Sequence, residues 1–458
     1  MADISGKTKW LRIATSIGAL YLDSCLHGAI VPIVAEWDWA ATDVPLTTNR
    51  SQTNGNEETR ASFAIGAIFL STGLVEIGLS PIAGMTADQF GFDLVILIGL
   101  LIGILKCLLF GLLGTSIVIV STNRVLQGAL SACTQTIAMA RIRDVYAKAS
   151  PECANVMAIA LCKMAFNFFA GLVIGELYGY LKYRVFLLFL PISLLLIIGV
   201  LITFRNDNFH SKDKSNGKDE CEQNSSGAVR WRVICDVQLM IVTTCCMFST
   251  LGQSSLEPSF AVWMKSSFEA GPKSTGVILG LCGVASITSS LASAQIQPAL
   301  QHRSWIFCMA SLCTAGVPLL LVNFSPNIVV AGVALCTHLF GATAARFTLL
   351  MMCSTIANSR YPQSYGLVFA MFNVGWAASF LLGPLLASYL FGSVCVICII
   401  GAACIASSLL TVILQTLDSK QGPNIMDCFP NDYPKYQIVT STGGPPLSYE
   451  EEIQQPKD

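Results

Sequence analysis

Apolar runs of about twenty residues recur along most of the chain. A helix needs about 20 apolar residues to cross a bilayer, so each run is a candidate transmembrane helix. The composition agrees, because only 12% of the residues are charged, against about 25% in soluble proteins. We therefore predict an all-α polytopic membrane protein with twelve transmembrane helices, at about 11–34, 62–85, 94–114, 116–138, 153–175, 184–204, 236–262, 274–296, 304–323, 327–353, 364–388 and 392–415.

A charged segment without apolar periodicity separates the sixth run from the seventh. It divides the chain into two halves of six helices each. After the last run the sequence is polar and rich in proline, a composition typical of disorder. The predicted organisation is an N-terminal half (1–204), a cytosolic linker (205–232), a C-terminal half (233–415) and a disordered cytosolic tail (416–458).

The distribution of lysine and arginine favours both termini in the cytosol. In that orientation the loop 35–61 faces the other side, where Asn49 begins an Asn-Arg-Ser glycosylation sequence. In the tail, the sequence Tyr436-Gln-Ile-Val439 fits a tyrosine-based signal for sorting adaptors. The net charge of −1 gives no indication of a nucleic-acid partner. No nucleophile–base pair, phosphate loop or metal-ligand set is evident, so we expect neither an enzyme nor a cofactor.

Seven ionisable residues lie inside the apolar runs. Such charges are costly in a membrane, usually face the bundle interior, and mark routes for substrates or ions. The acid in the first run either binds a cation or a proton, or forms a structural ion pair with one of the two arginines. The basic side chains are also long enough to reach toward the membrane surface. The seven residues are Asp23, Glu76, Lys106, Arg124, Lys163, Glu257 and Arg346.

The placement of these charges follows the two halves. Asp23 and Glu257 lie in the first run of each half, and Arg124 and Arg346 lie in the fourth. An internal repeat gives this pattern, and repeat transporters bind their substrates near the midplane between the halves. We therefore expect a site between the two halves.

Several motifs resemble those of known transporters. The segment Gly84-Met-Thr-Ala-Asp88-Gln-Phe-Gly91 resembles a conserved loop of the major facilitator superfamily, as do Arg124-Val-Leu-Gln-Gly128 and Gly383-Pro384. Within that superfamily, Leu22-Asp23 and Leu256-Glu257-Pro258 look like the vesicular amine transporter family. The resemblance implies exchange of a cytosolic amine for lumenal protons.

The same resemblance implies roles for individual residues. Asp23 matches the aspartate that binds the cationic amine in that family, Glu257 matches the glutamate of its site, and Arg124 matches the arginine of the fourth helix. Together with Lys163 we assign Arg124 to a network of buried charges. Gly84, Asp88, Gly91, Arg124 and Gly128 match the motifs that govern conformational change.

Other positions depart from that family. Thr72 stands in place of a lysine, Asn373 in place of an acid, and Arg346 in place of the aspartate linked to proton coupling. A guanidinium cannot release its proton, so coupling would have to use Asp23, Glu76 or Glu257. Arg346 and Asn373 stay candidates for contact with the substrate.

Three functions are compatible with these residues. The first is proton-coupled antiport of a small cationic amine into secretory or synaptic vesicles. The second is transport of a zwitterionic or anionic solute, which the arginine at position 346 would suit. The third is a transport-inactive sensor or scaffold in the membrane, motivated by the lost acid of the tenth run.

Overall fold

The computed structural model describes residues 6–30, 54–114, 116–146, 150–211, 231–300, 303–389 and 394–420, and this part of the chain is helical without strands. The main elements are α1 (Gly6–Gly28), α3 (Asn54–Phe90), α4 (Phe92–Leu113), α5 (Ile117–Val145), α6 (Pro151–Leu161), α7 (Lys163–Leu181), the 3-10 helix η1 (Lys182–Phe189), α8 (Leu190–Ser211), α10 (Val237–Phe268), α11 (Pro272–Ile296), α12 (Ser304–Leu321), α13 (Ile328–Arg360), α14 (Tyr365–Tyr389) and α15 (Val394–Lys420).

The prediction of an all-α membrane protein is confirmed. Among the described residues, nine helical segments are long and apolar enough to cross a membrane. One of them, Pro151–Arg205, contains the helices of both the fifth and the sixth predicted runs. Helices α1 and α5 are not among the nine. The many polar side chains of α5 lower its hydropathy, and these side chains are central to the site described below.

Some helix ends differ from the prediction. The fifth run is divided at Cys162, where ψ is −10° and the backbone tightens between α6 and α7. The sixth begins with the 3-10 helix η1. Helix α8 continues to Ser211 and α15 to Lys420, beyond the ends predicted at 204 and 415. Asn49 and the segment 436–439 lie outside the described residues, as does most of the predicted linker.

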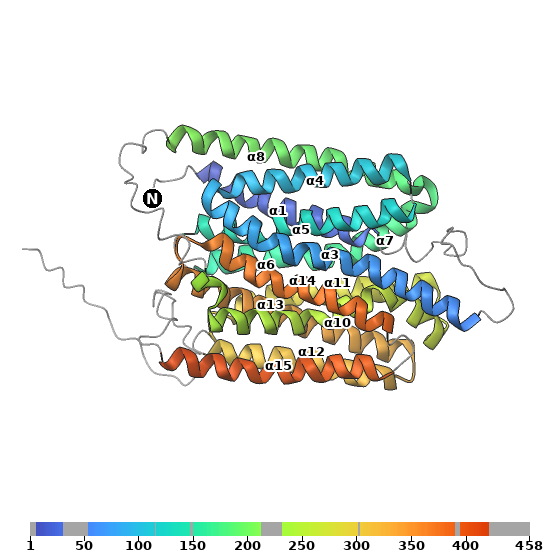
Figure 1. The fold of residues 1–458 in the computed structure, drawn as a ribbon. Helices are drawn as coiled ribbons and strands as arrows, with labels where there is room; N and C mark the ends of the chain where they lie inside the picture. The colour runs from blue at the N-terminus through green and yellow to red at the C-terminus, as the bar shows by residue number, and fades with distance from the viewer. Residues whose placement is uncertain are drawn as a thin grey trace, which may run out of the picture.

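The helices lie side by side along one common direction (Figure 1). The elements from α1 to α8 occupy one side of the bundle and those from α10 to α15 the other. Several helix pairs pack across this boundary, among them α3 against α14, α7 against α11, α5 against α14 and α6 against α11. The arrangement is compatible with the predicted two-half division, which stays a prediction.

Glycines let several helix backbones approach one another closely. A Cβ atom on Gly84 of α3 would lie 2.6 Å from the carbonyl oxygen of Gly366 on α14. A Cβ on Gly128 of α5 would lie 2.5 Å from the carbonyl oxygen of Thr72 on α3. Small residues let helix backbones meet in this way in membrane proteins. Helix α3 is thereby held against both α5 and α14.

Ion pairs tie helix ends together within each half. Arg141 of α5 pairs with Asp93 of α4 and also donates to Thr15 at 2.9 Å. In the other half, Arg360 and Asp236 form an ion pair of 3.0 Å. The Tyr361 hydroxyl donates to the same Asp236 carboxylate at 2.9 Å. Burial and this hydrogen bond raise the pKa of Tyr361 to about 12.

Candidate functional site

Asp23 is fully buried on α1 and faces α5. Its carboxylate accepts hydrogen bonds from Gln127 Nε2 at 2.7 Å, Ser131 Oγ at 2.8 Å and Gln135 Nε2 at 2.8 Å. The three donors follow one another at four-residue intervals, so they form one stripe along the helix. Side chains of a single helix therefore satisfy this carboxylate.

Two lysines join Asp23 indirectly. Lys106 of α4 donates to the side-chain oxygen of Gln127, and Lys163 of α7 donates to that of Gln135. Each glutamine thus carries one hydrogen bond from a lysine and passes one to Asp23. Both lysines are buried. The alternative that they reach the membrane surface is therefore wrong.

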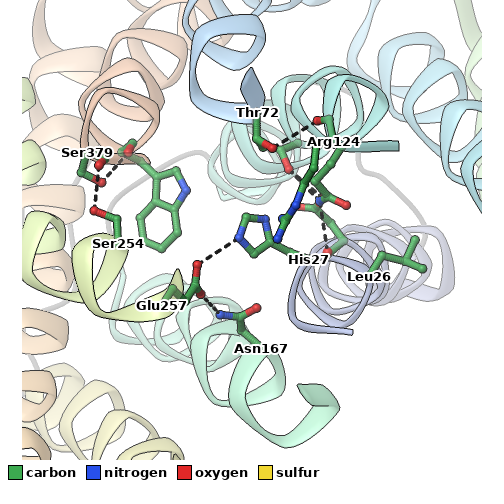
Figure 2. A network of polar contacts seen from close by, with 12 residues as sticks. Leu26, His27, Thr72, Arg124, Asn167, Ser254, Glu257 and Ser379 are labelled. Atoms are coloured by element: carbon green, nitrogen blue, oxygen red, sulfur yellow. Dashed lines mark hydrogen bonds and ion pairs between the residues drawn. The ribbon is translucent and has the colours of Figure 1, made fainter. Parts of the chain in front are cut away.

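Glu257 of α10 lies at the boundary between the two sides of the bundle (Figure 2). Its carboxylate is 3.3 Å from His27 Nε2 on α1 and accepts a hydrogen bond of 2.5 Å from Asn167 on α7. Its side chain is only 6% exposed. Glu257 therefore connects one side of the bundle to two helices of the other.

A second acid crosses the same boundary. Glu76 of α3 accepts a hydrogen bond of 2.9 Å from Asn373 of α14. The same amide donates to Ser80 Oγ at 3.0 Å. Asn373, predicted to contact substrate, is thus a partner of Glu76.

Arg124 of α5 is fully buried, and its guanidinium carbon lies 3.9 Å from the centre of the Phe69 ring. Within the described part of the chain, none of its three guanidinium nitrogens has a hydrogen-bond partner. Its backbone carbonyl accepts a hydrogen bond from Thr72 Oγ1 at 3.2 Å. The charged end of this side chain is therefore held by a ring rather than by an acid.

Arg346 of α13 is buried as well, so the alternative that it reaches the membrane surface is wrong. It donates to Ala342 O and Thr343 Oγ1, each at 3.3 Å. Its guanidinium carbon lies 5.0 Å from the centre of the Trp376 ring, and Lys163 Nζ lies at the same distance from that ring. The structure forms no ion pair between Asp23 and either Arg124 or Arg346, as far as its described residues show.

Gly84 and Asp88 of the predicted conformational motif lie at the contact between α3 and α14. The Asp88 carboxylate accepts hydrogen bonds from the backbone nitrogens of Gly366 at 2.6 Å and Leu367 at 2.9 Å. These are amides of the first turn of α14, where a negative charge also complements the helix dipole. Gly91 follows with a φ of 95°, a value that favours glycine. Asp88 therefore caps a helix of the opposite side.

Sequence reasoning missed the neutral members of the site. His27 follows Asp23 by four residues, so the two side chains lie on the same face of α1. The four-residue spacing of Gln127, Ser131 and Gln135 is visible in the sequence and could have indicated a polar stripe. Asn167 carries no such signal. The arrangement brings Asp23, Lys106 and Lys163 into one network and Glu257 into another.

Comparison with known proteins identifies the class. Residues 28–364 match the family description Major Facilitator Superfamily. The match covers most of the chain, which therefore belongs to this superfamily. The finding agrees with the motifs around Asp88 and Arg124.

Individual proteins within this superfamily show more specific similarity to the chain. The chain is 24% identical to the vesicular acetylcholine transporter of Torpedo marmorata, over 83% of this chain and 76% of that protein. It is 23% identical to the vesicular acetylcholine transporter unc-17 of Caenorhabditis elegans, over 83% and 74%. Both findings confirm the resemblance to vesicular amine transporters. In fold, the chain is similar to the human organic anion transporter MFSD10 (TETRAN), with a TM-score of 0.63 and 16% identity over 88% of this chain and 99% of that one.

Proposed function

We propose that this protein is a secondary active transporter that exchanges a small amine for protons across a vesicle membrane. Its membership of the superfamily and its likeness to vesicular acetylcholine transporters support this proposal. The observation that carries it is the position of Glu257. This buried acid of α10 is held by His27 of α1 and Asn167 of α7, so its bonds span the two sides of the bundle.

Alternating access gives these bonds a role. In transporters built from repeats, one half rocks against the other around a site near the midplane. An ammonium group that binds Glu257 would replace His27 and Asn167 as partners of the carboxylate. The contacts that join α10 to α1 and α7 would then be lost. A proton on the same carboxylate would exclude the ammonium, which couples the two fluxes.

The other two buried acids, Glu76 and Asp23, have different roles in this proposal. Glu76 also bonds across the boundary, through Asn373, so it is a second candidate for proton transfer. Asp23 is satisfied from α5 and holds Lys106 and Lys163 through two glutamines. We therefore assign the amine to Glu257 first, and to Asp23 an electrostatic role in the network.

Transport in proteoliposomes tests the proposal. The purified protein is reconstituted, an acidic interior is imposed, and uptake of labelled acetylcholine and monoamines is measured. We expect uptake that collapses when a protonophore removes the gradient, and that is abolished in Glu257→Gln. The exposed residue Glu176 of α7 supplies the matched control, since Glu176→Gln should transport normally. Uptake that ignores the gradient, or that survives in Glu257→Gln, would contradict the proposal.

The compartment is part of the proposal. We expect a multi-pass protein of the secretory or synaptic vesicle membrane, because the relatives are vesicular transporters. Sorting adaptors would bind Tyr436–Val439. Replacing Tyr436 with alanine should move a fluorescently tagged protein from vesicles to the cell surface. An unchanged distribution would remove this signal from the proposal.

A further inference from the structure

Basic residues outnumber acids in the interior of the bundle. Of the seven ionisable residues predicted inside the membrane runs, four are basic and three are acidic, and all seven side chains are buried. With histidines counted as neutral, four against three leaves one positive charge in excess. A buried charge without a partner is strongly destabilising. The excess therefore indicates that an anionic group belongs in this interior.

Arg124 differs from the other three basic residues in its contacts. Asp23 holds Lys106 and Lys163 through glutamines, whereas Arg346 donates two hydrogen bonds of its own. Arg124 makes no side-chain hydrogen bond among the described residues, although all three of its nitrogens are buried. The Phe69 ring covers one face of the guanidinium. A ring offsets only part of the cost of burial, because it offers no hydrogen-bond acceptor.

We propose that Arg124 binds a carboxylate of the substrate, so that the transported amine is a small zwitterion. This inference rests on the proposed function, because Glu257 is the group that takes the ammonium end. Two parallel hydrogen bonds from a guanidinium fit a carboxylate well. Arg124 would supply the recognition that distinguishes the zwitterion from a simple amine.

The geometry suits a molecule with both charges. Arg124 of α5 belongs to one side of the bundle and Glu257 of α10 to the other. Figure 2 shows the Arg124 side chain extending toward His27, with Glu257 on the other side of the imidazole. A zwitterion that spans the two groups would place its ammonium at Glu257 and its carboxylate at Arg124. Thr72, next to Arg124, carries no charge that would compete for the carboxylate.

Pairs of quaternary amines in which one member carries a carboxylate test the inference. Choline is compared with glycine betaine, and acetylcholine with acetylcarnitine, in equilibrium binding to the purified protein in lipid nanodiscs. The wild-type protein should bind the carboxylated member of each pair at least about tenfold more tightly. In Arg124→Gln, the affinity for that member should fall at least about tenfold. The affinities for choline and acetylcholine should stay within about twofold of the wild-type values. Arg184→Gln, which removes an exposed arginine, should change neither.

Two results would overturn the inference. One is a wild-type protein that binds choline as tightly as betaine. The other is an Arg124→Gln variant whose affinity falls equally for both members of a pair. If Arg124→Gln does not fold, Arg124→Lys keeps the charge but cannot donate two parallel hydrogen bonds to a carboxylate. This variant should selectively lower the affinity for betaine. Binding is measured without a pH gradient, so failure of proton-driven uptake would contradict the proposed function and leave this result standing.

Discussion

At the scale of the residue, Asp23 supports two lysines that it does not touch. Gln127 and Gln135 transmit its charge to Lys106 and Lys163. Asp23→Asn removes the charge in this group that opposes the lysines, and leaving a buried charge uncompensated costs up to about 3–5 kcal/mol. We expect a clear fall in the melting temperature of the purified protein in detergent, together with loss of uptake.

Thr136 of α5 provides a matched control for that variant. Its buried hydroxyl has no hydrogen-bond partner among the described residues, so Thr136→Val removes a polar group without breaking a contact. The change should be close to neutral. A variant Asp23→Asn that melts like the wild-type protein and still transports would show that the lysines do not depend on this carboxylate.

The sequence indicated the charged residues of the site but not their partners. Asp23, Arg124 and Glu257 stand out because a charge within an apolar run is costly. Glutamines and asparagines carry no such signal, and which of them meets Asp23 depends on how α1 packs against α5. The sequence therefore left a direct ion pair open, whereas the structure places two amides between the acid and the lysines.

At the scale of the element, the Asp88 carboxylate of α3 caps the first turn of α14. Asp88→Ala leaves the amides of Gly366 and Leu367 without this acceptor. Loss of a helix cap costs about 0.5–2 kcal/mol. Hydrogen exchange at these two amides should therefore accelerate by about 2- to 30-fold. Amides in the middle of α14 serve as the internal control. Unchanged exchange at the first turn would mean that Asp88 does not hold it.

Glycines on α3 allow a second prediction about this contact. A Cβ on Gly84 would meet the Gly366 carbonyl oxygen, whereas a Cβ on Gly78 meets nothing within 4 Å. Gly84→Ala should cost about 1–3 kcal/mol of stability, and Gly78→Ala should gain up to about 1 kcal/mol because alanine favours the helix. Melting temperatures of the two variants check this. Equal effects would rule out close packing as the reason for Gly84.

The elements themselves were largely predictable, because each apolar run of about twenty residues is long enough to span the membrane. The positions of the helix ends were not predictable. The division at Cys162 leaves the apolar pattern unbroken, so nothing in the hydropathy marks it. Helices α3 and α13 extend well past their apolar runs, because polar residues continue a helix once packing and capping sustain it.

At the scale of the whole molecule, the proposed exchange requires the two sides of the bundle to separate in turn. Their contacts therefore have to be breakable. The side chain of Gln295 on α11 donates to Asn155 on α6 at 3.1 Å, and Ser290 donates to the carbonyl of Ala158 at 2.7 Å. These neutral hydrogen bonds net only about 0.5–1.5 kcal/mol each. They hold one conformation without making it permanent.

A covalent link at this contact should stop transport. In Asn155→Cys/Gln295→Cys, a bifunctional methanethiosulfonate reagent would form a disulfide with each new thiol, join α6 to α11 and fix the two sides together. We expect proteoliposome uptake to be lost after the reagent and restored by a reducing agent, while each single-cysteine variant stays active. A link within one side supplies the control, because Gln238 and Arg360 contact each other at 2.8 Å between α10 and α13. Gln238→Cys/Arg360→Cys should transport after cross-linking, since helices of one side move together. Full uptake by the cross-linked 155/295 pair would contradict rocking of the two halves.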